Sequence, residues 1–140
     1  MTDPGTFVLD PRLEGDSVPV CDLDLCTVRL MKDARFPWVI LVPRIADLAE
    51  LIDLSHADRQ VVTDEIDRVT RALYAHTSAE KMNVAALGNM VRQLHVHVIA
   101  RFAGDAAWPG PVWGVGTAQA YTEEDRAERL EALRAALIGA

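Results

Sequence analysis

A chain of 140 residues, half of them hydrophobic and a quarter charged, is long enough for a single domain with a buried core, which we expect to span residues 1–140. The formal net charge of −7 excludes a broad basic footprint for a nucleic-acid polymer, although one nucleotide needs only local hydrogen-bond donors. No apolar run reaches the roughly 18–20 residues of a membrane span. No signal peptide is visible, so we expect a cytoplasmic protein without membrane partners.

Strand-like segments come first in the chain. Residues 17–21 and 25–31 have the length of strands, and the second alternates in side-chain character. A turn containing Asp33 follows. Residues 38–42 are apolar throughout and are followed by Pro43, a pattern typical of a buried central strand.

Helical spacing appears next. Residues 48–54 predict a short helix, and residues 55–58, Ser-His-Ala-Asp, match a capping box. Behind that box apolar residues recur at helical spacing: Val62, Ile66, Val69 and Leu73. We therefore predict an amphipathic helix over residues 57–77.

The second half of the chain adds a pair of strands and a terminal helix. Residues 82–87 and 94–100 are predicted strands, joined by a tight loop at residues 88–92. Residues 104–116 are rich in Gly, Pro and Trp and should be irregular. Residues 122–125, Thr-Glu-Glu-Asp, predict the start of a last helix. The short connections favour an α+β fold, an antiparallel sheet with helices on one face.

Two histidines on one strand are the main functional signal. Because side chains alternate along a strand, one face carries the polar set Gln93, His95 and His97. Imidazole is the usual acid, base and metal ligand near neutral pH. A metal site on these two histidines needs a third ligand, and no carboxylate lies nearby on this face. Nucleophilic or acid–base catalysis is the other interpretation.

Residues 93–99, Gln-Leu-His-Val-His-Val-Ile, resemble the signature of the histidine triad (HIT) family, His-φ-His-φ-His-φ-φ, in which φ is apolar. Upstream residues match the family's Asn…Gly-Gln-x-Val approach to the motif: Asn83, Gly88, Asn89 and Val91.

Two further segments extend the resemblance. Residues 101–105, Arg-Phe-Ala-Gly-Asp, resemble the Pro-Arg-x-x-Gly-Asp of the diadenosine-polyphosphate hydrolase branch. Residues 37–43 resemble the family's Pro-x-His-φ-φ-φ-φ-Pro strand. The resemblance covers residues 18–106.

The resemblance implies a HIT-like antiparallel sheet of about five strands with one long helix and a C-terminal helix, paired into a homodimer. It also implies cleavage at the α-phosphate of a nucleotide or dinucleoside polyphosphate, without a metal or other cofactor. Carried over by position, His95 is the nucleophile and forms a nucleotidyl-histidine intermediate. His97 contacts the phosphate or the bridging oxygen of the leaving group. Since neutral imidazole needs its other nitrogen fixed by an acceptor, we expect a backbone carbonyl near His95 to serve.

Other residues are expected to bind substrate. By position in the resemblance, Asn89 and Arg101 contact phosphate, Asn83 supports that loop or reaches the phosphate, and Asp33 binds the ribose. Residues 108–113, Trp-Pro-Gly-Pro-Val-Trp, either pack in the core or the dimer interface or form a wall of the substrate pocket. Trp108 is our candidate for stacking on a base.

Two positions depart from the family pattern. Gln93 stands in the place of the first triad histidine, and Trp38 in the place of a histidine on an earlier strand. Glutamine forms hydrogen bonds but takes up no proton near pH 7, and indole only donates. We expect a catalytically competent enzyme with Gln93, His95 and His97 in its site. The alternatives are a nucleotide-binding homologue with little turnover and a metal-binding protein.

Overall fold

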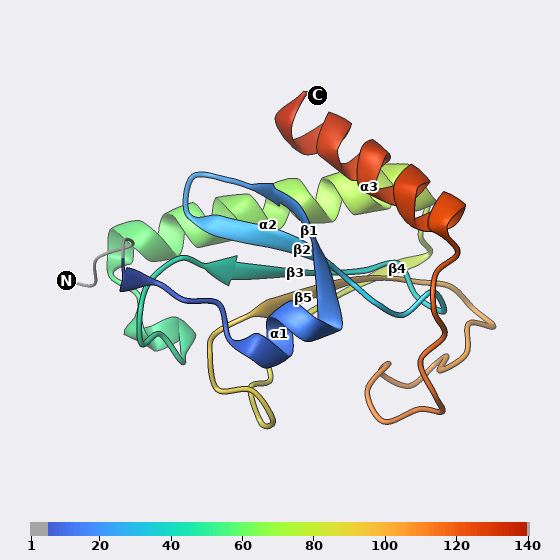
Figure 1. Cartoon of the computed structure of the whole chain (residues 1–140), viewed down its shortest axis with the longest axis horizontal. Helices are drawn as coiled ribbons and strands as arrows, with labels where there is room; N and C mark the ends of the chain where they lie inside the picture. The colour runs from blue at the N-terminus through green and yellow to red at the C-terminus, as the bar shows by residue number, and fades with distance from the viewer. Residues whose placement is uncertain (1–5, 140) are drawn as a thin grey trace.

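The computed structural model describes residues 6–139, so both outermost ends of the expected domain lie outside the described part. A five-stranded antiparallel sheet, in the order β1-β2-β3-β5-β4, forms the centre of the molecule (Figure 1). In chain order the elements are α1 (Pro11–Asp16), β1 (Ser17–Asp22), β2 (Cys26–Met31), β3 (Trp38–Pro43), the 3-10 helix η2 (Leu51–Asp53), α2 (His56–Thr77), β4 (Lys81–Ala85), β5 (Val96–Arg101) and α3 (Glu123–Ile138). The expected α+β fold is confirmed.

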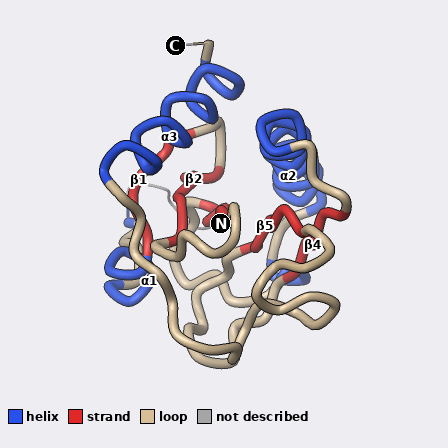
Figure 2. Tube along the Cα trace, turned by 90° about the vertical axis from the view of Figure 1, so that its right-hand side faces the viewer, coloured by secondary structure: helices blue, strands red, loops and turns tan. Residues whose placement is uncertain are grey.

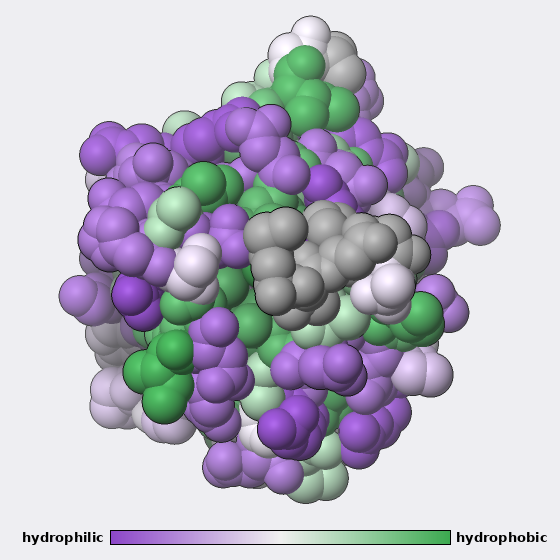
Figure 3. Space-filling model, turned by 90° about the vertical axis from the view of Figure 1, so that its left-hand side faces the viewer, coloured by the Kyte–Doolittle hydropathy of each residue, from purple (hydrophilic) through white to green (hydrophobic). Residues whose placement is uncertain are grey.

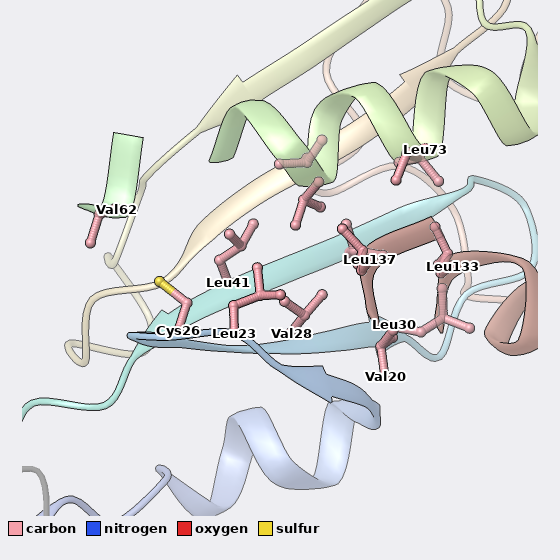
Figure 4. Packing of buried hydrophobic residues seen from close by; sticks show 14 of the residues in the cluster. Val20, Leu23, Cys26, Val28, Leu30, Leu41, Val62, Leu73, Leu133 and Leu137 are labelled. Atoms are coloured by element: carbon pink, nitrogen blue, oxygen red, sulfur yellow. The ribbon is translucent and has the colours of Figure 1, made fainter. Parts of the chain in front are cut away.

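The two faces of the sheet are covered differently. Helices α2 and α3 pack over one face, and α1 lies against the other (Figures 1 and 2). On β3, Val39 and Leu41 belong to the core under α2 and α3, whereas Ile40 and Val42 pack against Leu13 of α1. The helices contribute buried side chains to the main core (Figure 4): Val62, Val69, Leu73, Leu133 and Leu137. The face beneath α1 is the one that carries the histidines, because His97 pairs with Ile40.

Side-chain caps define the helix starts. The hydroxyl of Ser55 accepts the N–H of Asp58 at 3.1 Å, and the hydroxyl of Thr122 accepts the N–H of Asp125 at 3.1 Å. Both predicted helix starts are thereby confirmed. Helix α1 was not predicted. Its signal is an N-cap aspartate, Asp10, directly before a proline at the first helical position, a combination favoured at short helix starts.

Among the predicted boundaries that were wrong, two share one reason. Residues 48–54 form only the three-residue turn η2 instead of a helix, and β5 begins at Val96 instead of residue 94. The carbonyl of Leu48 accepts the N–H of Leu94 at 2.8 Å. The Leu48 carbonyl is therefore not used in a helical hydrogen bond, and the Leu94 N–H is not used in a bond to a neighbouring strand. The loop before the histidines is therefore fastened to the segment that follows β3.

A buried carboxylate joins α2 to the sheet. Glu65 is 3% exposed and accepts the backbone N–H groups of Leu25 and Cys26 at 3.0 and 2.8 Å.

No helix within residues 6–139 is long and apolar enough to cross a membrane. The face of the molecule in Figure 3 is mainly hydrophilic, with hydrophobic patches between the polar groups.

Candidate active site

His95 has the arrangement of a nucleophilic imidazole. The residue is 7% exposed, and Nδ1 lies 2.7 Å from the backbone carbonyl oxygen of Gln93. A carbonyl oxygen only accepts hydrogen bonds, so in the neutral ring Nδ1 carries the proton and donates it. The lone pair then resides on Nε2. The predicted carbonyl partner is therefore present two residues before the histidine.

His97 has the opposite tautomer. Its Nδ1 lies 2.9 Å from Nε1 of Trp38, and an indole N–H can only donate. Nδ1 of His97 is therefore the acceptor, and in the neutral ring the proton is on Nε2. Burial, with a smaller contribution from His95, lowers the pKa of His97 from 6.5 to about 3. At neutral pH this ring is an uncharged hydrogen-bond donor, and its centroid lies 4.8 Å from that of His95.

Both histidines line one cavity of about 520 Å³. Its walls are mostly apolar, and they come from α1, β2, β3, the loop after β4 and the irregular segment after β5. The lining residues are Leu13, Asp16, Met31, Trp38, residues 87–91, His95, His97 and Trp113. An apolar pocket with a few convergent polar groups is the usual form of a small-molecule site.

The loop after β4 supplies polar groups to this cavity. Gly88 has a φ of 79°, in the left-handed region that favours glycine, and this conformation shapes the turn. Asn89 lines the cavity next to it, and its side chain is exposed. Its amide has no hydrogen-bond partner within residues 6–139, so it is available to a ligand. The structure thus brings Asn89 together with His95 and His97, as the substrate-binding prediction requires.

Gln93 has a different setting from the one expected of a catalytic residue. Its Oε1 accepts the N–H of Asp10 at 2.9 Å, and its Nε2 donates to the carbonyl of Val8 at 2.9 Å. The side-chain amide thus clamps the segment before α1 to the histidine strand. The contribution of Gln93 to the site is made by its backbone carbonyl, which holds His95, and by the clamp that keeps α1 in the cavity wall.

Replacing Gln93 with alanine is expected to lower the free energy of unfolding by about 2 kcal/mol, because two hydrogen bonds of about 1 kcal/mol each are lost. Gln93→His, which gives the residue of the signature that this segment resembles, should also destabilise the protein, since a neutral imidazole cannot reproduce both bonds from the same position. Urea denaturation measures both effects. Gln60→Ala, at an exposed position of α2, is the matched control and should change stability by less than about 0.5 kcal/mol. Equal stability of Gln93→Ala and Gln60→Ala would contradict the clamp.

Three of the predicted substrate-binding residues lie together, but outside the lining of the histidine cavity. Arg101 is 2% exposed, and its guanidinium donates to both carboxylate oxygens of Asp105, to Oδ1 of Asn83 and to the carbonyl of Gly110. The ring of Trp108 lies over that guanidinium at 5.7 Å. Arg101 is thus bonded to Oδ1 of Asn83 and to the loop after β5, and a phosphate-binding role for Arg101 or Asn83 stays a prediction.

Asp33 lies beside a smaller, adjoining cavity. This cavity has a volume of about 290 Å³ and shares Asp16, Met31, Trp38 and Trp113 with the larger one. Burial raises the pKa of Asp33, but hydrogen bonds from Arg35 and from the backbone of Gln119 outweigh it and leave the pKa below 3.8. The carboxylate is therefore ionised and held by Arg35 at 2.9 Å. A ribose-binding role for Asp33 stays a prediction.

Within residues 108–113, the tryptophan that lines the cavities is Trp113, which the sequence did not single out. Its ring meets His97 edge-on, with centroids 5.0 Å apart, and it lines both cavities. Trp108, chosen in its place, is absent from the residues lining either cavity, since its ring is turned to Arg101. The two tryptophans flank the same Pro-Gly-Pro-Val segment, and nothing in their spacing distinguishes the inward ring from the outward one.

A family model described as the HIT domain matches residues 12–104. The chain belongs to the HIT domain family. Both His95 and His97 lie within the matched residues and line the cavity described above.

Solved structures of HIT proteins match nearly the whole chain. The histidine triad protein of Sinorhizobium meliloti 1021 is 50% identical, with a TM-score of 0.91 over 94% of this chain and 97% of its own. That of Bradyrhizobium japonicum is 46% identical, with a TM-score of 0.92 over 94% and 98%. That of Marinobacter aquaeolei VT8 is 44% identical, with a TM-score of 0.90 over 94% and 96%. No curated protein matches the chain.

The metal-binding interpretation lacks a ligand set in this HIT domain. Among the residues described, no group of three or more His, Cys, Asp or Glu side chains is arranged to hold a metal ion. Each histidine also has Nδ1 engaged, by a carbonyl in His95 and by an indole in His97. A zinc site needs at least three protein ligands, so the pair alone does not provide one.

Proposed function

We propose that this HIT protein is a nucleotidyl hydrolase or transferase that cleaves at the α-phosphate of a nucleotide or dinucleoside polyphosphate through a nucleotidyl-His95 intermediate. One observation supports this most strongly. Two buried imidazoles share a cavity wall in opposite tautomers, so one presents a lone pair on Nε2 and the other an N–H on Nε2. A nucleophile beside a donor that can stabilise developing charge on the phosphate supports phosphoryl transfer through histidine.

The first step forms the intermediate. Nε2 of His95 attacks the α-phosphorus, a P–N bond forms, and the bond from phosphorus to the leaving group breaks with its electron pair on the leaving group. His95 then bears a positive charge, with a proton on Nδ1 and phosphorus on Nε2. The carbonyl of Gln93 stabilises this charge, because it accepts the Nδ1 proton at 2.7 Å. His97 and the amide of Asn89 donate to the phosphate oxygens.

The second step releases the nucleotide. A water oxygen attacks phosphorus, the P–N bond breaks, its electron pair returns to Nε2, and one proton passes to solvent. An alcohol or amine in place of water makes the same step a transfer. Phosphate is held here by hydrogen bonds and not by cations, because no lysine or arginine is among the described residues that line the cavity.

A substrate panel tests the proposal: diadenosine tetraphosphate, adenosine phosphoramidate and adenylylated lysine, each assayed for turnover. We expect at least one to be cleaved with release of the nucleoside monophosphate and with a nucleotidyl mass trapped on His95. The preferred substrate identifies the branch, for which the resemblance of residues 101–105 favours diadenosine polyphosphate. Turnover without any adduct on His95 would overturn the mechanism.

The alternative function is a nucleotide-binding protein with little turnover. The observation that favours it is the clamp of Gln93, which leaves the cavity with two imidazoles where the family signature has three. Nucleotide binding by the wild type with no cleavage and no adduct across the whole panel would select this alternative.

We also propose a homodimer, which acts in the cytoplasm. The outer edge of β4 has no strand partner within residues 6–139, and Val84 and Leu87 beside it are 47% and 43% exposed. Unpaired strand edges with apolar neighbours are ready to pair with another chain. Cys21 and Cys26 are unpaired, as thiols of a reducing compartment are.

The dimer is tested by sedimentation velocity at micromolar concentration. The wild type is expected to sediment as a dimer, and Val84→Lys should shift it toward monomer because the charge is placed beside the pairing edge. Ile138→Lys, at an exposed position of α3, is the control and should leave the dimer intact. A wild-type monomer would contradict this architecture.

A further inference from the structure

A side-chain hydrogen bond joins Trp38 of β3 to His97 of β5 at the site. In the register of β3 and β5, Trp38 pairs with Ile99, and Ile40 pairs with His97. Trp38 and His97 are therefore diagonal neighbours on one face of the sheet, within reach of long side chains. The indole N–H donates to Nδ1 of His97 at 2.9 Å, and the two residues are 7% and 5% exposed.

The indole is held in place by aromatic contacts. Phe36 meets the Trp38 ring edge-on with centroids 6.4 Å apart, and Trp113 meets it at 6.0 Å and nearly perpendicular. Trp113 also contacts the His97 ring, at 5.0 Å, but forms no hydrogen bond with it among the described residues. One tryptophan thus supplies a polar contact to His97, and the other supplies packing alone.

We propose that Trp38 is a positioning residue: its N–H excludes a proton from Nδ1 of His97 and so presents His97 to the substrate as a neutral donor through Nε2. This rests on the proposed function for its catalytic consequence, while the hydrogen bond itself does not depend on it. The nearby titratable groups do not oppose this assignment. On the cavity wall they are His95 from the same chain segment and Asp16 from α1, whereas β3 and the segment after β5 contribute only indoles.

A neutral donor changes what the reaction demands of its substrate. His97 can stabilise charge on an oxygen through its N–H, but transferring that proton would leave an imidazolate, which is far too basic to form at neutral pH. The P–O bond to the leaving group therefore breaks without proton transfer from His97, and its electron pair leaves on an anion. Leaving groups that are stable as anions should accordingly react much faster than basic ones.

The direct test is nitrogen-15 NMR of the histidine rings in the whole protein, followed over pH. In the wild type, Nδ1 of His97 should have the shift of an unprotonated nitrogen and Nε2 that of a protonated one, without titration between pH 5 and 8. In Trp38→Phe, Nδ1 of His97 should no longer be held as an acceptor, so the two neutral tautomers should mix and the shifts of both ring nitrogens should move toward each other, while burial keeps the ring uncharged. Trp113→Phe is the matched control, because it makes the same indole-to-phenyl change in the other ring that contacts His97 and should leave the tautomer unchanged.

Kinetics give the second readout. With aryl esters of adenosine monophosphate, the wild-type rate should fall by about tenfold per unit of leaving-group pKa, as expected when the bond breaks without protonation. In Trp38→Phe, the rate should fall by a similar factor for every leaving group and the dependence should stay as steep, because burial keeps His97 neutral and only its tautomer changes. At pH 7 the variant should lose about tenfold in rate. That is less than the 10²–10³-fold typical of removing a donor, because His97 still populates the Nε2–H tautomer.

Two outcomes would overturn the proposal: a proton on Nδ1 of His97 in the wild type, or a Trp38→Phe protein in which His97 behaves as in the wild type. The first needs no variant, so it decides the matter even where Trp38→Phe does not fold. Failure of the proposed function is seen separately, as the lack of any nucleotidyl adduct on His95, and it leaves the NMR result standing.

Discussion

Replacing His95 with alanine is expected to reduce cleavage of the preferred nucleotide by at least about 10³-fold and to abolish the nucleotidyl adduct. The reason is that His95 is the one imidazole of the described cavity lining whose Nε2 carries a lone pair, since Nε2 of His97 is protonated. Nucleotide binding should persist, because the apolar walls, Asn89 and His97 remain. Turnover, intact-protein mass and equilibrium binding of the nucleoside monophosphate measure the three effects.

His56→Ala is the matched control for this experiment. His56 is exposed at the first residue of α2 and is not part of the cavity, so its loss should leave turnover unchanged. A His95→Ala protein that retains turnover within tenfold of the wild type would remove His95 as the nucleophile. Inactivity of both the wild type and the variant, with binding preserved, would instead support the nucleotide-binding alternative.

Replacing Arg101 with alanine is expected to lower the free energy of unfolding by about 3–5 kcal/mol, the range for breaking one partner of a buried ion pair. The Asp105 carboxylate is 8% exposed and would keep its charge without its guanidinium partner. Asn83 and the carbonyl of Gly110 would lose bonds as well. Chemical denaturation with tryptophan emission or circular dichroism measures the loss.

The chain contains an internal control for burial. Arg71 and Asp67 form a pair with the same sequence spacing and the same Nε–Oδ2 distance of 2.8 Å as Arg101 and Asp105, but they are 79% and 59% exposed. Arg71→Ala should therefore cost no more than about 0.5 kcal/mol. Equal effects of Arg71→Ala and Arg101→Ala would show that the buried pair contributes no more than a surface one.

Acid should weaken the same buried pair. Hydrogen bonds from Arg101, and then from the backbone of Phe102, Ala107 and Trp108, hold the pKa of Asp105 well below its usual 3.8. Below pH 3.8 the unfolded chain takes up a proton that the folded protein does not, so this contribution is present above that pH and is lost as the pH falls through the folded pKa. The neutral state of His97 acts in the same direction from pH 6.5 downward, because the unfolded histidine is protonated more readily.

Side-chain periodicity predicted most of the fold, because each element buries a face of its own. The long helix shows this, since its apolar stripe and its serine cap lie within residues 55–73 and need no distant partner. The errors arose where a distant partner decides the local structure. Residues 48–54 do not form a helix, because Leu48 accepts a bond from Leu94, 46 positions away in the sequence.

The two histidines of the candidate site were predictable from the sequence, but the contacts of the side chains around them were not. Alternation along the strand placed His95 and His97 together, and the need for a fixed tautomer predicted the carbonyl partner. The hydrogen-bond partners of Gln93, Trp38 and Arg101 could not be predicted from the sequence, because each of these side chains has donors that suit several acceptors. Only the packed chain decides that Gln93 binds residues 8 and 10, and that Trp38 binds His97 across the sheet.

The aromatic environment of His97 gives the protein an optical reporter of its own. Of the three tryptophans, Trp38 and Trp113 lie 5.7 and 5.0 Å from the His97 ring, while Trp108 lies over Arg101. Indole emission depends on the polarity around the ring and on neighbouring proton donors. Ligand binding in the cavity should therefore change the intrinsic tryptophan fluorescence of the protein. Trp108 is not among the residues lining the cavity, so its contribution to the emission should stay unchanged.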